Sequence, residues 1–403
     1  MTKYAGNGQF SIGRLSLFYD AGGSEKEIDM KSAYVQIDLY ESIFEHTMSG
    51  TVAIVDAFNL QDLLPLYGNE RIEIEFFTQG NEGNPVSYIG AVYKVSEKHR
   101  VSEHSSGYRI HFISHEALNS QRVNVNRSYE ETPSHIVSQL YKRIIGPSQK
   151  GYNALSTRAV APYTFGTIKP LQAVSVLSKH SVSTNNDYGY LFYEDNKQFN
   201  FMPLQALYQQ DPVREYRSRP AGMSDDEQQR VQEAHGTVQD IKVMEENSYL
   251  DRIMEGQHGT TSHRFDLFSK QLETYEYDKQ SEFRKSKSLG ANAYKKDIEA
   301  SYEDRVAIRY DNNPTVQLPT IAKGIQQKVE INTIRVEITV FGDSIMRCGT
   351  CVDAYLPIWN KDQDQVTDML TGKFLVSEIH HQLNNEEKYL QTIMLQKDAY
   401  ENL

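Results

Sequence analysis

The C-terminal stretch GKFLVSEIHHQLNNEEKYLQTIMLQKDAY, residues 372–400, predicts a β-hairpin. Apolar side chains alternate with polar ones on both sides of Asn384 to Glu387, and those four residues have turn chemistry. A similar stretch, YKVSEKHRVSEHSSGYRIHFISHEAL, occupies residues 93–118. The chain therefore carries two hairpins of related pattern, and the rest of the sequence is interpreted from them.

The two stretches align at a constant offset. Val95-Ser96-Glu97 matches Val376-Ser377-Glu378, which is an offset of 376 − 95 = 281 residues, and Tyr108 matches Tyr389 at the same offset. This alignment makes His99 equivalent to His380. Strand-like segments precede both hairpins in the same order, after Gly68 to Arg71 in one case and after Gly349 to Cys351 in the other, and earlier at 52–55 and 334–340. A repeat this far apart predicts two copies of one β-domain rather than a solenoid.

Length and composition bound the class of protein. A chain of 403 residues exceeds one usual core, so two to four domains are expected. The hydrophobic content of 39% and mean hydropathy of −0.59 are typical of a soluble protein. We expect neither a membrane span nor a signal peptide, and therefore folding in the cytoplasm. Two cysteines are too few for a disulfide framework, which fits a reducing compartment.

The charge balance argues against a nucleic-acid-binding surface. There are 42 basic and 54 acidic residues, for a net charge of −12, so few phosphates could be neutralised. DNA as a passenger is still allowed. The chain also has 26 tyrosines beside one tryptophan, and such amphipathic rings suit both protein–protein contacts and edge strands.

The order of patterns predicts five segments. Residues 1–122 are rich in short alternating strands and form a first small antiparallel barrel or sandwich. Residues 123–234 form an α+β unit, with one helix capped by the Thr132 hydroxyl and another starting near Pro170. Residues 235–265 begin the second β-domain, 266–326 are a polar insertion that is short of aliphatic side chains, and 327–403 complete the second domain.

Candidate sites for chemistry are few. Cys348 and Cys351 form a C-x-x-C, but the pair precedes a strand, and the adjacent His380 and His381 point to opposite faces, so neither a redox site nor a zinc site is expected. Glu97 and Glu378 lie two residues before His99 and His380, where surface salt bridges explain them better than duplicated acid–base pairs. The run Asp225 to Glu227 is expected to be a solvated loop.

No nucleophile elbow, P-loop, zinc-protease motif or dinucleotide fingerprint occurs. The sequence therefore predicts no catalytic, cofactor-binding or metal-binding residues. An assembly or scaffold protein is the leading interpretation, and an enzyme is the alternative.

In its domain order the sequence resembles the baseplate central hub proteins of contractile-tailed bacteriophages and, more distantly, the N-terminal part of VgrG spike proteins. The resemblance rests on Ser49 to Asp56 with the strand after Gly68, the helix from Thr132 to Ile144, the segment Leu171 to Phe192, and Lys373 to Ala399. It covers most of the chain. Unlike VgrG, the sequence ends at Leu403 with no later β-helical spike or lysozyme-like segment.

The resemblance implies an α+β, mainly β fold with two similar small barrels, the second interrupted, and an α+β domain. It implies a homotrimer whose 3 × 2 = 6 barrels form a pseudo-six-fold ring, which adapts a three-fold central spike to a six-fold tail tube. The implied partners are the spike, tail tube or tube-initiator proteins, and baseplate wedge and tape-measure proteins. The implied location is the tail baseplate of a virion assembled in the host cytoplasm.

The resemblance also implies a bore that passes DNA during ejection without binding it specifically. Three chains carry 3 × −12 = −36 charges, so we expect a negative lining that repels phosphate. Two alternatives remain: a tail-associated peptidoglycan hydrolase, and the hub of a secretion or contractile injection system.

Overall fold

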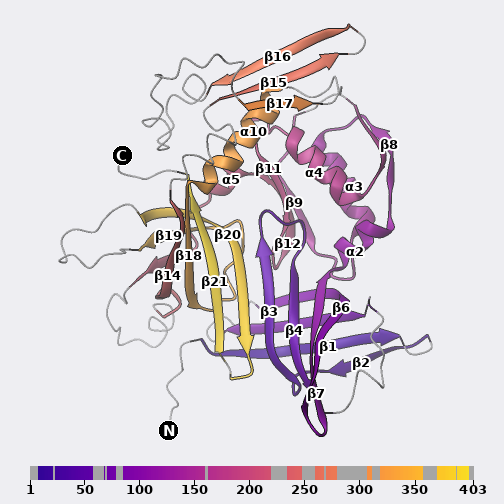
Figure 1. The fold of residues 1–403 in the computed structure, drawn as a ribbon, viewed down its shortest axis with the longest axis vertical. Helices are drawn as coiled ribbons and strands as arrows, with labels where there is room; N and C mark the ends of the chain where they lie inside the picture. Colours follow the sequence, from indigo (N-terminus) through magenta and orange to yellow (C-terminus); the bar gives the residue numbers. More distant parts are fainter. Residues whose placement is uncertain are drawn as a thin grey trace, which may run out of the picture.

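The computed structural model describes residues 8–20, 23–57, 68, 70–78, 85–158, 162–218, 234–246, 259–266, 269–278, 306–310, 318–356, 370–386 and 388–398. The predicted solvated loop at Asp225 to Glu227 lies outside these residues. The described chain is mainly β with antiparallel sheets and few helices, as the sequence predicted (Figure 1).

The first half of the chain forms seven strands. They are β1 (Phe10–Asp20), β2 (Glu25–Asp29), β3 (Tyr34–Ser42), β4 (Ser49–Asp56), β5 (Arg71–Thr78), β6 (Val86–Ser102) and β7 (Ser105–Ser114). In space the order is β3-β4-β7-β6-β5-β1-β2, and every pair is antiparallel. Alternation places one side of each strand in a core, so Ile37 and Leu39 of β3 pack with Val52 and Ile54 of β4.

The C-terminal part repeats this arrangement. Its strands are β13 (Glu215–Arg217), β14 (Val238–Glu246), β18 (Ile334–Phe341), β19 (Cys351–Tyr355), β20 (Thr371–Asn384) and β21 (Lys388–Lys397). The order β14-β18-β21-β20-β19 corresponds strand for strand to β3-β4-β7-β6-β5. The two predicted hairpins are therefore real, as β6–β7 and β20–β21, and occupy the same place in each half.

Two pairs of β-bulges fix the alignment of the halves. Val35 is the extra residue between β3 and β4, and Gln239 is the extra residue between β14 and β18. In the hairpins the extra residues are Tyr93 and Ser377. Because a bulge shifts register by one residue, a shared bulge marks equivalent positions.

The second pair of bulges corrects the sequence alignment. It matches Val376 with Val92. The Val92 amide donates to the Glu70 carbonyl at 2.8 Å, just before β5, and the Val376 amide donates to the Thr350 carbonyl at 2.9 Å, just before β19. The sequence match of Val376 with Val95 is therefore three residues out of step. His380 corresponds to Ser96, and the predicted equivalence of His99 and His380 is wrong.

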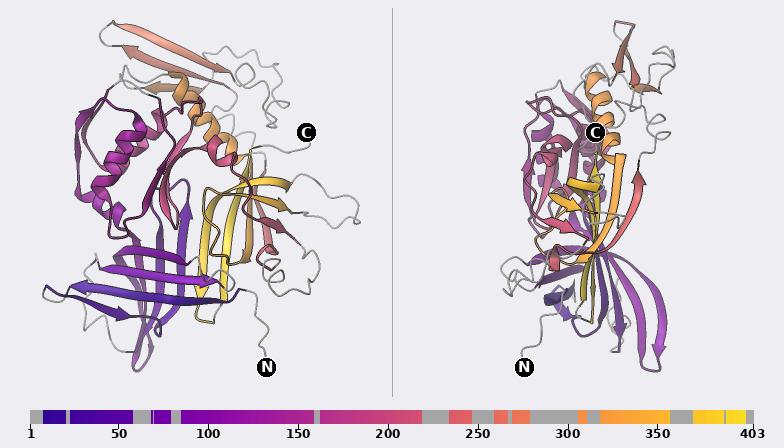
Figure 2. Two further views of the ribbon diagram at one scale, coloured as in Figure 1. Left: turned by 180° about the vertical axis from the view of Figure 1, so that it is seen from behind. Right: turned by 90° about the vertical axis from the view of Figure 1, so that its left-hand side faces the viewer.

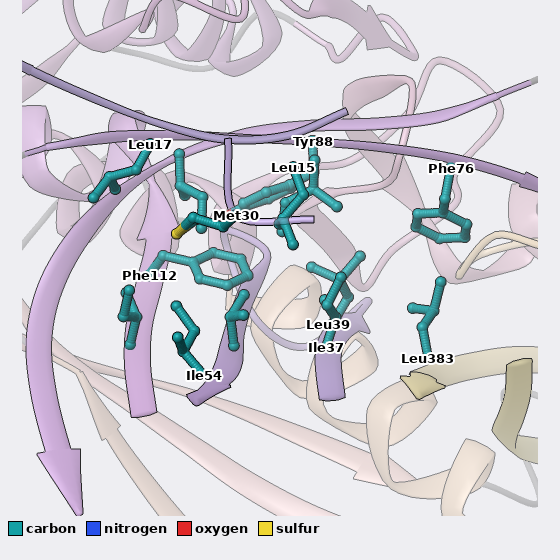
Figure 3. Close-up of a cluster of buried hydrophobic side chains, with 14 of the residues drawn as sticks. Leu15, Leu17, Met30, Ile37, Leu39, Ile54, Phe76, Tyr88, Phe112 and Leu383 are labelled. Atoms are coloured by element: carbon teal, nitrogen blue, oxygen red, sulfur yellow. The ribbon is translucent and has the colours of Figure 1, made fainter. Parts of the chain in front are cut away.

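The two halves join edge to edge. β3 pairs antiparallel with β20, from Ser42 opposite Glu378 to Gln36 opposite Asn384, so one sheet runs through both halves. Each half keeps its own core, but Leu383 of β20 packs into the first one beside Phe76 (Figure 3). Among the described strands the sheet ends at β2 and β14 and does not close, so the predicted barrels are not confirmed.

The middle unit is α+β, and its elements follow one another between the halves. They are α2 (His115–Arg122), β8 (Val125–Tyr129), α3 (Pro133–Ile144), β9 (Gly151–Ala154), β10 (Tyr163–Ile168), α4 (Pro170–His180), β11 (Tyr190–Glu194), β12 (Gln198–Pro203) and α5 (Leu204–Tyr208). Helices α3 and α4 begin at the prolines that the sequence indicated. Thr132 is the N-cap residue of α3 but makes no side-chain capping bond, so that detail of the prediction is wrong.

The segment between β14 and β18 forms a separate small sheet with a helix. Its elements are β15 (Gly259–Asp266), β16 (Gln271–Asp278), β17 (Val306–Tyr310), α10 (Leu318–Glu330) and the 3₁₀ turn η2 (Ile331–Thr333). β15 starts before residue 266 and α10 continues past 326, so the polar insertion is wider than its predicted bounds. Figure 2 shows this sheet at the far end from β1–β7, with α10 running back toward β18.

Candidate assembly interface

The seam between the halves contains a fully buried polar network. His381 of β20 contacts Glu41 of β3, with Nε2 at 3.2 Å from Oε1, and Tyr389 of β21, with Nδ1 at 2.7 Å from the hydroxyl oxygen. The other Glu41 oxygen accepts a bond from the Cys348 amide at 3.1 Å. Since an unpaired buried charge is costly, these bonds make the pairing of the two halves specific.

This network combines an acid, a histidine and a tyrosine, as many catalytic sites do, but it is closed to solvent. Glu41, His381 and Tyr389 are 1%, 0% and 0% exposed. Burial raises the pKa of Tyr389 well above its usual value, so the phenol stays neutral. Gln391 donates to the Tyr389 hydroxyl at 2.8 Å and to the Asp343 carbonyl at 2.9 Å, which completes the network. Because no substrate can reach these atoms, their role is structural.

The opposite face of the seam is open to solvent and carries a second network. His380 stacks on Tyr40 with ring centroids 4.6 Å apart and contacts Asp38 at 2.9 Å through Nε2. Arg109 of β7 lies 3.6 Å from Asp38 and 3.0 Å from Glu97. Burial acts to raise the pKa of Asp38, but bonds from His380 and Gln36 and the charge of Arg109 outweigh it, so this pKa is lowered.

The structure thus separates the two neighbouring histidines as the sequence predicted. His380 faces solvent and His381 faces the core, because successive strand residues point to opposite faces. Glu97 makes the predicted kind of surface salt bridge, with Arg109. His99 is exposed near the hairpin end and contacts only the Glu97 carbonyl, at 2.8 Å, among its described hydrogen bonds.

The two cysteines are buried and reduced. Cys351 begins β19, and Cys348 lies in the turn before it. Burial raises the pKa of Cys351 to about 11 and raises that of Cys348 well above its usual value. Thiolates are the reactive form, so this pair is chemically inert at neutral pH.

A third buried network joins the first half to the middle unit. Lys150 and Glu194 form an ion pair at 2.7 Å, with side chains 7% and 1% exposed. The second Glu194 oxygen accepts bonds from the Met48 amide at 2.8 Å and the Ser114 hydroxyl at 2.5 Å. These contacts place the end of β11 against the β4 and β7 ends of the first half.

Sequence reasoning missed Glu41, Lys150 and Glu194. The strand pattern contained a signal for Glu41. Ile37, Leu39 and Glu41 alternate along the core-facing side of β3, and Glu41 is an acid where an apolar residue is expected. No comparable signal marks Lys150, because its partner lies 44 residues away on another strand.

The described residues contain no cluster of three or more side chains able to hold a metal ion. None of the helices in the described ranges is long and apolar enough to span a membrane.

Comparison with known proteins gives a likeness of fold. No protein-family model and no curated protein matches the sequence. A tail protein from Neisseria meningitidis superimposes with a TM-score of 0.56 at 11% identity, covering 97% of this chain and 96% of that one. The tail protein of prophage MuSo2 from Shewanella oneidensis gives 0.56 at 10% identity, covering 95% and 97%.

A component of the Escherichia coli type VI secretion system aligns at a TM-score of 0.48 and 10% identity, over 96% of this chain and 76% of that one. The two tail-protein matches, both at a TM-score of 0.56, show that the fold is that of phage tail proteins. The resemblance inferred from domain order is confirmed at the level of fold, while the particular role stays a matter for proposal.

Proposed function

We propose that this chain is the structural hub of a contractile tail baseplate, a homotrimer that adapts a three-fold spike to a six-fold tube. The observation that carries the proposal is the repeat itself: two halves of the same strand order, with shared bulges, joined edge to edge. A closed ring of such chains has twice as many β units as chains, and three chains give 3 × 2 = 6. The phage-tail fold supports the same class.

The trimer is tested by measuring the mass of the purified protein at high concentration, by native mass spectrometry or sedimentation velocity. We expect three chains per particle. A monomer at all concentrations would count against the hub, and a dimer or tetramer would contradict the match to a three-fold spike.

The solvent-facing side of the seam is the proposed channel lining. Arg109 and His380 already contact carboxylates there, so these side chains are poorly placed to hold phosphate. This pairing supports a bore that passes DNA without retaining it and refines the expectation from net charge. A structure of the assembled tail with a lumen of unpaired Lys and Arg would refute it.

A tail-associated peptidoglycan hydrolase is the enzyme alternative. A zymogram of the purified protein separates the two, because clearing that is lost on replacing one carboxylate has no place in a hub. The other alternative is a hub of a secretion or injection machine. The genes beside the gene for this chain, especially a separate spike gene and tail sheath genes, distinguish this alternative from a phage hub. The proposed wedge, tube and tape-measure contacts, virion location and cytoplasmic assembly follow from the hub role.

A further inference from the structure

Two strand edges without a described strand beside them are the equivalents of the two edges that meet at the seam. β14 is the last strand at one end of the sheet path, and β18 is its one partner among the described strands. β5 pairs with β6 only up to Ala91, so from Lys94 onward β6 has β7 on one side and no described strand on the other.

The bulges show which residues are equivalent. Through the Val35 and Gln239 bulges, β14 takes the place of β3. A second bulge at Met244 adds one more residue, so Glu245, opposite Arg335, corresponds to Tyr40, opposite Ser49. Through the Tyr93 and Ser377 bulges, β6 takes the place of β20, and Ser96 corresponds to His380. In the seam Tyr40 is directly opposite His380.

We propose that β14 of one chain pairs antiparallel with residues 94–100 of β6 in the neighbouring chain, repeating the β3–β20 seam between subunits. Glu245 then lies opposite Ser96. The proposal rests on the proposed trimer and deepens it, because it names the surface through which the chains associate. Free strand edges are templates for such pairing.

Charge supports this choice of partner. Residues 94–100 read KVSEKHR, which has three Lys or Arg and one Glu, whereas residues 239–246 read QDIKVMEE, which has three Asp or Glu and one Lys. Opposite charges on facing strands favour pairing, and two copies of the same edge would repel each other.

The geometry makes the contact head to tail. Each chain offers one β14 edge and one β6 edge, which differ and lie at opposite ends of the strand order from β14 to β6, so each contact joins one chain to the next. Repeated head-to-tail contacts generate a closed ring if the rotation closes. Within one chain, the β3–β20 seam sets the rotation between the two halves. The contact between subunits repeats the same rotation.

A pair of cysteines tests the register. In the double variant Ser96→Cys, Glu245→Cys, oxidation should link each chain to the next and give a covalent species of three chains on a non-reducing gel. Mixing the two single variants should give linked pairs only, and each single variant alone should give none. The natural cysteines are buried and should not interfere.

The matched control is Ser96→Cys with Asp240→Cys. Asp240 lies on the same strand, five residues from Glu245 with the Met244 bulge between them, about 13 Å along the strand. That separation is beyond disulfide reach. We expect no covalent trimer from this control. Hydrogen exchange of the wild-type protein is a second measurement that needs no substitution, and protection of β14 and residues 94–100 should rise with assembly.

The outcomes separate the two proposals. A trimer by mass without cross-linking, and with unprotected β14 and β6 edges, overturns the edge pairing and leaves the hub intact. A monomer without cross-linking overturns both. Covalent rings of another size support the edge pairing and contradict the trimer. Equal cross-linking of the control pair overturns the register.

Discussion

Gly349 and Gly68 lie in similar turns with different surroundings. Both lie just before equivalent strands, with φ of +78° and +92°, a region that favours glycine. A Cβ at Gly349 would meet the Tyr193 hydroxyl at 2.1 Å, whereas at Gly68 the nearest atom is at 3.8 Å. We therefore predict that Gly68→Ala costs about 1 kcal/mol of unfolding free energy from backbone strain alone. Gly349→Ala should cost roughly 2 kcal/mol more because of overpacking.

Urea denaturation of the two variants and the wild type measures this difference. Similar losses for both glycines would show that the Tyr193 ring moves aside freely, contrary to the prediction.

His180, at the end of α4, predicts an acid sensitivity. Burial lowers its pKa from 6.5 to about 4, and its ring stacks on Tyr163 with centroids 6.0 Å apart. The unfolded chain binds a proton below pH 6.5 and the folded chain only near pH 4, so stability falls as pH drops through this window. At about 1.4 kcal/mol per pKa unit the loss is on the order of 3 kcal/mol.

His180→Phe removes this titration and keeps an aromatic ring. Unfolding free energies measured between pH 7 and pH 4 should fall less steeply for the variant than for the wild type. Identical slopes would mean that His180 does not contribute to the acid sensitivity.

At the scale of elements, the Lys150–Glu194 pair holds the β11 strand end against the first half. Lys150→Ala leaves Glu194 charged and buried, with one partner lost, and we predict a loss of about 3 to 5 kcal/mol. The double variant Lys150→Met, Glu194→Gln removes both charges and should be less destabilised than Lys150→Ala. Denaturant unfolding of the wild type, Lys150→Ala and the double variant measures this difference. A double variant that loses as much stability as Lys150→Ala, or more, would contradict the prediction.

At the scale of the whole molecule, the seam should make the two halves unfold together. Leu383 belongs to β20 but packs in the core of the first half (Figure 3). Leu383→Ala should cost about 2 to 5 kcal/mol. It should also speed hydrogen exchange in both β3–β4 and β20–β21.

The matched control is Leu177→Ala in α4, also fully buried but in the core of the middle unit. We expect its effect to appear first in α3 and α4. Faster exchange confined to β20–β21 in the Leu383 variant would show that the halves unfold independently.

The sequence predicted the hairpins and the helix starts well, because alternation and proline position are local signals. It aligned the repeats wrongly at His99 and His380, since it matched the shared Val-Ser-Glu letters. The bulges at Tyr93 and Ser377, which fix the true register, have no residue signature. It also misjudged the Thr132 cap, whose hydroxyl makes no capping bond in the fold.

By itself, the sequence determined that this protein is mainly β, repeated and interrupted in its second half, because periodicity and strand order are written along the chain. Only the tertiary structure decided that the halves share one sheet through β3 and β20, and that Glu41, His381 and Tyr389 meet out of reach of solvent. Pairing between strands more than 300 residues apart depends on edge geometry and buried hydrogen bonds, which no local pattern encodes.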